Sequence, residues 1–65
     1  MKLKINGEIV EVAATTVQEL AEELSPAPQT LLIEHNLKEL LRSEWKETVL
    51  SEDDRIEVLR VSAGG

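Results

Sequence analysis

The stretch RIEVLRVSAGG (55–65) decides the fold, because its first seven residues read as a strand from the interior of a sheet. Successive side chains of a strand point to opposite faces, and both faces carry apolar residues here: Ile56 and Val58 on one, Leu59 and Val61 on the other. Such a strand is typical of an internal position with neighbours on both sides. The residues that follow have little side chain to pack, so we expect a domain over 1–61 and a flexible tail over 62–65.

The N-terminal segment predicts a β-hairpin. In MKLKI (1–5), apolar residues alternate with lysines at the period of a strand with one buried face. Asn6-Gly7 is the strongest short hairpin signal, because both central residues of that turn need a positive φ. EIVEVA (8–13) then returns as the second strand, with Val10 and Val12 on the same face.

The segment TTVQELAEELSP (15–26) predicts a helix. Its apolar residues recur at helical spacing, with polar residues on the opposite side: Val17, Leu20, Ala21 and Leu24. Thr16 followed by Glu19 fits a capping box at the start. The Ser25-Pro26 pair ends the helix, because the residue before a proline disfavours helical backbone. The following SPAPQT (25–30) reads as a short loop.

The next part of the chain predicts a strand and then a segment with mixed signals. TLLIE (30–34) reads as a strand that ends in a turn at His35-Asn36. LKELLRSEW (37–45) fits either a helix or an irregular edge of the sheet. Within it, Ser43 is a candidate cap for one short turn that carries Trp45.

Before the last strand, ETVL (47–50) reads as a short strand and SEDD (51–54) as a turn. The whole order is therefore strand, strand, helix, strand, a short irregular piece and strand. Strands crossed by one helix predict an α+β domain with two layers.

The composition argues against several classes of protein. Seven lysines and arginines stand against 13 aspartates and glutamates, for a net charge of −6, whereas a nucleic-acid-binding surface needs positive charge. No apolar stretch has the length of a signal sequence or a membrane span. The absence of cysteine is typical of the cytoplasm rather than of a short secreted chain. We therefore expect a cytoplasmic protein with neither a nucleic-acid partner nor a membrane partner.

No constellation of side chains predicts catalysis or metal binding. His35 is the only histidine, and a metal site needs several converging ligands. The acidic run EDD (52–54) lacks the spacing of a calcium loop and reads as a solvated turn. The four serines lack a base and an oxyanion-binding group: Ser25, Ser43, Ser51 and Ser62. We expect no catalytic residue, no metal ligand and no cofactor bound by this chain.

The tail offers chemistry of another kind. Its two glycines have no Cβ atoms and can enter a narrow channel, and the extended residues 62–65 reach about 13 Å. The functional group at their end is the α-carboxylate of Gly65. A carboxylate can attack a nucleoside triphosphate to form an acyl-adenylate, which a sulfur or nitrogen nucleophile then captures. A frayed end without function is the alternative interpretation.

In this order and length, the segments resemble the ubiquitin-like β-grasp proteins, and within them the sulfur carrier family of thiamin biosynthesis. The resemblance rests on these segments: KINGE (4–8), TTVQELAEEL (15–24), HN (35–36), RSEW (42–45) and DDRIEVLRVSAGG (53–65). It implies a mixed sheet of four to five strands with one main helix packed across it. The chain departs from the family at Leu37 and Asp53, where glycine is common, and at His35, where an apolar residue is expected.

The resemblance also implies a function, in which the chain is a carrier and not an enzyme. Gly65 would be adenylated by a ubiquitin-activating-like adenylyltransferase that uses ATP and Mg. It would then become a thiocarboxylate, with sulfur drawn ultimately from a cysteine desulfurase, and deliver that sulfur to thiazole synthase. Gly64, Ala63 and Ser62 would form the slim approach to it.

Other functions are compatible with the same tail. A carrier similar to the small subunit of molybdopterin synthase would use identical tail chemistry. A ubiquitin-like protein modifier would form an isopeptide bond to lysine through Gly65. A plain interaction domain would carry an idle tail.

A partner-binding surface is expected on the open face of the sheet. If Val10, Val12, Ile56 and Val58 face the helix, then alternation puts another apolar set on the opposite face: Ile9, Leu59 and Val61. Exposed apolar clusters often mark partner sites, so we expect this set to dock the activating enzyme and the synthase. Arg60 would be a polar rim contact near the base of the tail. The alternative is that loops of the domain cover these side chains.

Overall fold

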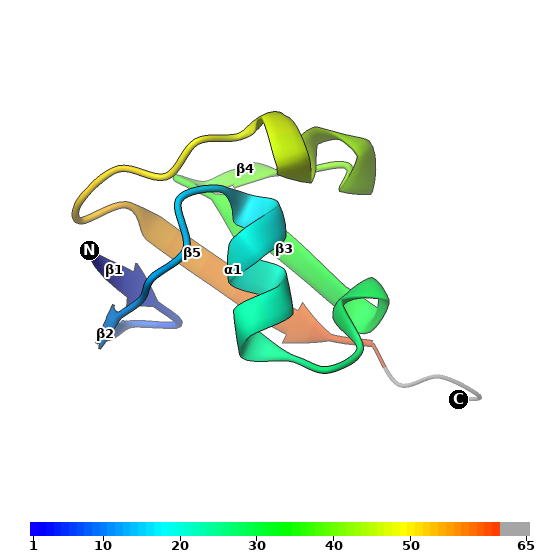
Figure 1. Ribbon diagram of the computed structural model, residues 1–65, viewed down its shortest axis with the longest axis horizontal. Helices are drawn as coiled ribbons and strands as arrows, with labels where there is room; N and C mark the ends of the chain where they lie inside the picture. Colours follow the sequence, from blue (N-terminus) through cyan, green and yellow to red (C-terminus); the bar gives the residue numbers. More distant parts are fainter. Residues whose placement is uncertain (62–65) are drawn as a thin grey trace.

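Five strands form one mixed sheet in the computed structural model, which describes residues 1–61 of the chain (Figure 1). The strand order is β2-β1-β5-β3-β4, with β1 and β5 parallel and the other neighbours antiparallel. The elements are β1 Lys2–Ile5, β2 Glu8–Glu11, α1 Val17–Leu24, η1 Pro28–Thr30, β3 Leu31–His35, β4 Lys38–Glu39, η2 Arg42–Glu47 and β5 Arg55–Arg60. The predicted α+β fold with one main helix and an internal last strand is confirmed.

The first hairpin forms as the sequence predicts. Asn6 and Gly7 have φ values of 50° and 85°, and they join β1 to the antiparallel β2. Asn6 also extends the sheet, because its side chain accepts a hydrogen bond from the Val58 backbone N–H at 2.8 Å and donates to the Val58 carbonyl at 3.2 Å. The turn of the hairpin is thereby fixed to the middle of β5.

The start of α1 corrects the predicted capping box in part. Thr16 is the N-cap, and its hydroxyl accepts a hydrogen bond from the Glu19 N–H at 3.2 Å. The Glu19 carboxylate, however, accepts from the backbone N–H of Thr15 at 2.8 Å and not from that of Thr16. Thr15 offers its hydroxyl as a second donor, also at 2.8 Å, which favours this bond. The helix ends at Leu24, with Ser25 as the C-cap, as predicted.

Two local predictions are wrong. Ser43 does not cap the turn that carries Trp45, because η2 begins one residue earlier, after Leu41. Residues 47–50 do not form a strand: Val49 makes only an isolated bridge to Thr16. The physical reason is that this segment bonds to the link before α1, with the Leu50 N–H donating to the Thr15 carbonyl at 2.9 Å.

The mixed signals of 37–45 resolve into the short edge strand β4 followed by η2. The predicted loop at 25–30 contains the single turn of η1, where Pro28 occupies the first turn of the 3₁₀ helix. Both short helices have too few residues for a helical pattern to stand out in the sequence.

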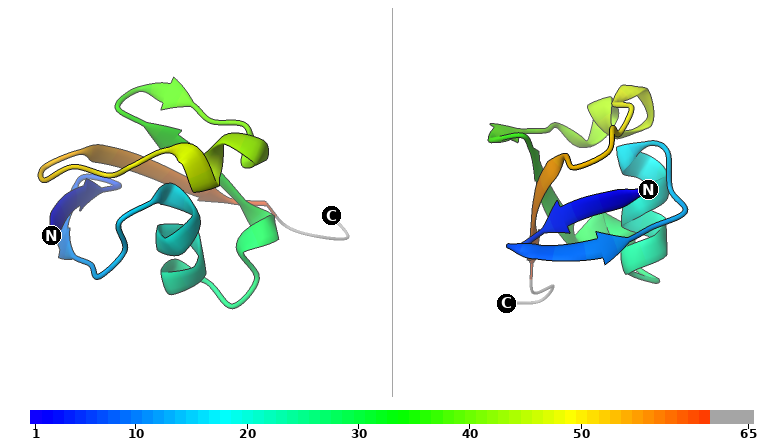
Figure 2. Two further views of the ribbon diagram at one scale, coloured as in Figure 1. Left: turned by 45° about the horizontal axis from the view of Figure 1, so that its top comes forward. Right: turned by 90° about the vertical axis from the view of Figure 1, so that its left-hand side faces the viewer.

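The core lies between one face of the sheet and the layer formed by α1 and η2, which lie on the same side (Figure 2). Alternation along the strands and helical spacing along α1 select part of this core, and the segments between those elements add Ala14, Leu40, Trp45 and Leu50. The full set is Leu3, Ile5, Val12, Ala14, Val17, Leu20, Ala21, Leu31, Ile33, Leu40, Trp45, Leu50 and Ile56. Val10 and Val58 pack against this cluster. Within residues 1–61, no helix combines the length and the apolar character that crossing a membrane requires.

Candidate functional site

The sheet holds the chain as far as Val61, at the base of the predicted tail. The N–H of Val61 donates to the Thr30 carbonyl at 2.7 Å, one step beyond the last residue pair of β3 and β5. The final strand therefore carries the chain to the end of the sheet that lies near η1 (Figure 1). The predicted sulfur-carrying Gly65 and the tail residues Gly64, Ala63 and Ser62 lie outside the described residues.

Ile9 and Leu59 lie on the face of the sheet opposite α1, as alternation predicts. Ile9 pairs with Lys4 and Leu59 pairs with Leu32, and each of the two predicted residues is largely exposed, at 73% and 64%. Val61, at 45% exposure, follows directly after β5. No loop among the described residues buries these side chains, but their docking role stays a prediction.

The predicted apolar set does not form one patch. Ile9 is on the edge strand β2, in a row with Lys4 and Arg55, whereas Leu59 is four residues further along β5. The neighbour of Leu59 is instead Leu32, its register partner on β3, which is 44% exposed. Sequence reasoning missed Leu32, although its position between the inward-facing Leu31 and Ile33 was the available signal.

Three glutamates continue the open face beside the leucine pair. Glu57 on β5 pairs with Glu34 on β3, which pairs in turn with Glu39 on β4. These carboxylates and the two leucines line one shallow hollow of about 330 Å³. Among the ion pairs within residues 1–61, none involves any of the three.

Arg60 lies away from this face. It pairs with the buried Leu31 and shares its orientation with Val58 and Ile56, whose side chains pack on the core side. Its exposed side chain therefore leaves the end of the sheet on the side of the helix layer. The predicted rim contact remains a prediction, at a place separate from Leu59.

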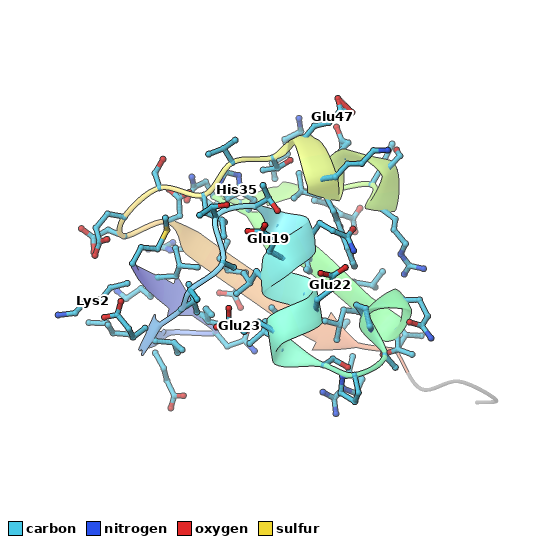
Figure 3. All side chains as sticks on the ribbon, viewed as in Figure 1. Lys2, Glu19, Glu22, Glu23, His35 and Glu47 are labelled. Carbon is cyan, nitrogen blue, oxygen red and sulfur yellow. The ribbon has the colours of Figure 1, made fainter. Side chains whose placement is uncertain are left out.

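His35 takes part in a structural cluster where β3 meets the segment that leads into β5 (Figure 3). Its Nε2 lies 2.8 Å from Oδ2 of Asp54, and Asn36 donates to Oδ1 of the same carboxylate at 3.2 Å. The backbone N–H of Ser51 donates to Oδ2 at 2.8 Å. Burial raises the pKa of Asp54, but the hydrogen bonds from His35, Ser51 and Asn36 outweigh it and hold that pKa below its usual value.

This cluster explains the departure from an apolar residue at position 35, because the imidazole ties the β3–β4 turn to the start of β5. No group of three or more metal-binding side chains gathers anywhere in the part of the chain that the structure describes.

The helix α1 carries a row of glutamates on its exposed side, at Glu19, Glu22 and Glu23 (Figure 3). Glu23 accepts hydrogen bonds from the backbone of Ala13 and Ala14, so its role there is structural.

The segment RSEW (42–45) supports the fold rather than a site. The Arg42 guanidinium lies over the Trp45 ring, 5.3 Å from its centroid, and donates to the Leu31 carbonyl at 3.3 Å. Trp45 is buried beneath it. Together they hold η2 against the start of β3, next to Thr30, whose carbonyl binds the N–H of Val61.

Comparison with known proteins agrees with this geometry. The family model described as "ThiS family" matches residues 3–65. The crystal structure of a thiamine biosynthesis protein (ThiS) from Geobacter metallireducens superposes with a TM-score of 0.82 at 28% identity, and the match covers 100% of both chains. A thiazole synthase of Magnetococcus marinus is 38% identical over 66 residues, which cover 100% of this chain. The chain spans only 20% of the length of that protein. A family match over nearly the whole sequence, with the same β-grasp fold, establishes that the chain belongs to the ThiS family, the sulfur carriers of thiamin biosynthesis.

Proposed function

We propose that this chain carries sulfur on the α-carboxylate of Gly65 and donates it for the thiazole ring of thiamin. The observation that supports this most directly is the family match, which extends through the terminal Gly-Gly. The fold adds support, because β5 is paired on both sides and brings the chain to the end of the sheet at Val61. A rigid strand that leads into four small residues suits delivery of the carboxylate into the active site of another protein.

The chemistry proceeds in two stages: activation of the terminal carboxylate at the phosphorus of ATP, and then replacement of AMP by sulfur at the terminal carbonyl carbon. The Gly65 carboxylate attacks the α-phosphate of ATP in an adenylyltransferase, which supplies Mg, and pyrophosphate leaves. A persulfide, loaded by a cysteine desulfurase, then displaces AMP to form an acyl disulfide. A second thiol attacks the donor sulfur of that disulfide, so the thiocarboxylate leaves and the donor is left as a disulfide. The chain contributes the reacting carboxylate and the docking surface, and the partners contribute the catalytic groups.

The acceptor in this proposal is thiazole synthase. The support is that a protein named thiazole synthase contains a segment 38% identical to the whole of this chain. Joining a carrier to its acceptor in one polypeptide raises the effective concentration of the tail at the active site. We place the docking of both partners on the open face at Leu59 and at Val61 near the base of the tail. Ile9, at the far edge of that face, and Arg60, on the helix side of the sheet, are proposed as separate further contacts. We also place the protein in the cytoplasm.

Intact mass spectrometry of the protein from its own cells tests the proposal. We expect a fraction whose mass corresponds to exchange of one oxygen for sulfur, and we expect sulfur depletion to diminish it. Removal of Gly65 should abolish the exchange, whereas the matched tail variant Ser62→Ala should retain it. The same unmodified mass in sulfur-replete and sulfur-depleted cells would overturn the proposal.

The same samples separate the alternatives. A protein modifier would give conjugates of high mass that disappear with Gly65. A carrier for molybdopterin synthase would form the thiocarboxylate but would not pass its sulfur to purified thiazole synthase. Full activity after deletion of Gly64 and Gly65 would support an idle tail.

A further inference from the structure

We propose that the open face near the tail docks a protein surface that is basic around an apolar centre. The face in question, here named the acidic face, consists of Leu32, Glu34, Glu39, Glu57 and Leu59. The inference rests on the proposed function, since it specifies the chemistry of the partner surface that this carrier meets.

The acidic face holds like charges side by side. Glu57, Glu34 and Glu39 are consecutive register partners across β5, β3 and β4. Side chains directly opposite one another in a sheet have Cβ atoms about 4.5–5.5 Å apart, and like charges at that spacing are destabilising. No lysine or arginine within residues 1–61 forms an ion pair with them. A partner that brings cations to this row of glutamates therefore relieves the repulsion among the three carboxylates.

The two leucines supply the apolar part of the contact. Leu32 and Leu59 are register partners, 44% and 64% exposed, and they line the same hollow as the three carboxylates. The centre of a protein interface is typically apolar with a polar rim. The acidic face has this composition, with the leucine pair as its centre and the glutamates along one side.

The charges on the open face also fix the direction of docking. Lys4 and Arg55 are register partners on β1 and β5, and Ile9 lies beside Lys4 on the edge strand. One end of the face is therefore basic, and the end that contains Leu59 is acidic. Leu59 is two residues before Val61, so a partner seated on the acidic face lies at the base of the tail. Residues 62–65 then reach about 13 Å into that partner.

A second copy of this chain is a less suitable occupant. Its basic end could meet the acidic end of the first copy, but the net charge of −6 on each chain opposes association at low salt. The same net charge attracts a basic partner. We therefore assign the face to a different protein, and self-association becomes an outcome of the test.

The test compares two triple variants that remove the same charge. The face variant is Glu34→Gln, Glu39→Gln and Glu57→Gln. The control variant neutralises three exposed glutamates on other parts of the surface: Glu8→Gln, Glu22→Gln and Glu47→Gln. Binding of each to the adenylyltransferase and to the thiazole synthase of the same organism is measured between about 0.05 and 0.5 M NaCl, a range over which charge screening becomes severe.

We expect the face variant to bind at least one of these partners about tenfold more weakly at low salt, with a flatter dependence on salt, since rim charges act chiefly through association. The control variant should follow the wild type. Equal behaviour of the two variants, or binding of the wild type that does not depend on salt, would overturn the proposal. So would a salt-sensitive dimer of the wild type that the face variant abolishes in sedimentation experiments.

Two further measurements test, separately from the docking itself, the proposed sulfur-carrier function and the repulsion among the glutamates. At saturating partner, the wild type should still acquire the thiocarboxylate, and its failure to do so would contradict the proposed function. If the wild type does acquire the thiocarboxylate but the face variant and the control variant bind the partners with equal affinity, only the proposal of the acidic face is contradicted. Without any partner, the face variant should unfold at a higher urea concentration than the control variant, because it relieves the cross-strand repulsion. A lower midpoint would contradict the electrostatic argument.

Discussion

Asp54 shows how one residue outside the proposed site determines local structure. Its carboxylate joins two segments, because it contacts the imidazole of His35 and the amide of Asn36 at the end of β3 and the backbone of Ser51 in its own turn. Its side chain is only 13% exposed, so water replaces these partners poorly. The depressed pKa of Asp54 records the preference of this cluster for the ionised carboxylate.

We expect Asp54→Asn to lower the free energy of unfolding by about 1–3 kcal/mol at neutral pH, as is typical for lost hydrogen bonds to a charged group. The folded-state pKa of Asp54 lies below the unfolded one, so its contribution is complete above the unfolded value of about 4. It is lost as the pH falls through the folded value. Urea unfolding at pH 7 and at about pH 2.5 should therefore show a difference between wild type and variant that shrinks with acid.

The neighbouring Asp53 provides the control for this prediction. Asp53 is exposed and has a φ of 70°, a conformation that asparagine also adopts readily. Asp53→Asn should leave the unfolding free energy within about 0.5 kcal/mol of the wild type. Equal losses at both positions, or a difference at Asp54 that does not depend on pH, would show that the cluster does not act through its charge.

At the scale of elements, the turn between β3 and β4 is strained. Asn36 and Leu37 have φ values of 50° and 73°, which place both in the left-handed region. Asparagine tolerates this region, whereas leucine pays a steric cost of about 1–2 kcal/mol there. Leu37 is also 73% exposed, so little burial offsets that cost. The resemblance identifies glycine as common at this position, and the backbone explains why.

We expect Leu37→Gly to stabilise the protein by up to about 1 kcal/mol, after allowance for the greater freedom of glycine in the unfolded chain. Thermal or urea unfolding measures the change. Leu37→Ala removes the same exposed side chain but keeps a Cβ atom in the left-handed region, so it should bring no gain. A destabilised glycine variant would mean that the leucine side chain itself supports the turn.

At the scale of the whole molecule, the core and the proposed chemistry lie in different parts of the chain. Every member of the buried cluster lies between Leu3 and Ile56. Within residues 1–61, the hydrogen bond nearest the C-terminal end of the sheet is the one from Val61 to Thr30. Folding and sulfur transfer can therefore be varied separately.

We expect deletion of 62–65 to leave the free energy of unfolding within about 0.5 kcal/mol of the wild type, while it abolishes thiocarboxylate formation. Deletion of 59–65 is the matched comparison, because it also removes the pairs of Leu59 with Leu32 and of Arg60 with Leu31. That longer deletion should be clearly destabilising in urea unfolding. A large loss from the short deletion would contradict the division between domain 1–61 and tail 62–65.

The sequence by itself determined the first hairpin, the helix α1 and the strands β3 and β5, and it indicated the proposed site of chemistry. The alternation around Leu3 and Ile5, the turn at Asn6-Gly7 and the helical spacing in 15–26 are local signals that the backbone obeys directly. The sequence holds no catalytic constellation of side chains, and the carboxylate of Gly65 is the group proposed to react. The strand predicted at 47–50 is wrong, because the hydrogen bonds of that segment go to the link before α1 and not to a strand.

Only the tertiary structure decided which side chains are neighbours on the open face of the sheet. Alternation assigned Leu59 and Ile9 to one face, but register separated them and brought Leu32 to Leu59 instead. The glutamate row and the contact of His35 with Asp54 arise in the same way, between residues far apart in the chain. The physical reason is that a strand's sequence fixes which face each side chain takes, whereas its neighbour is set by how the strands align when the shared core is buried.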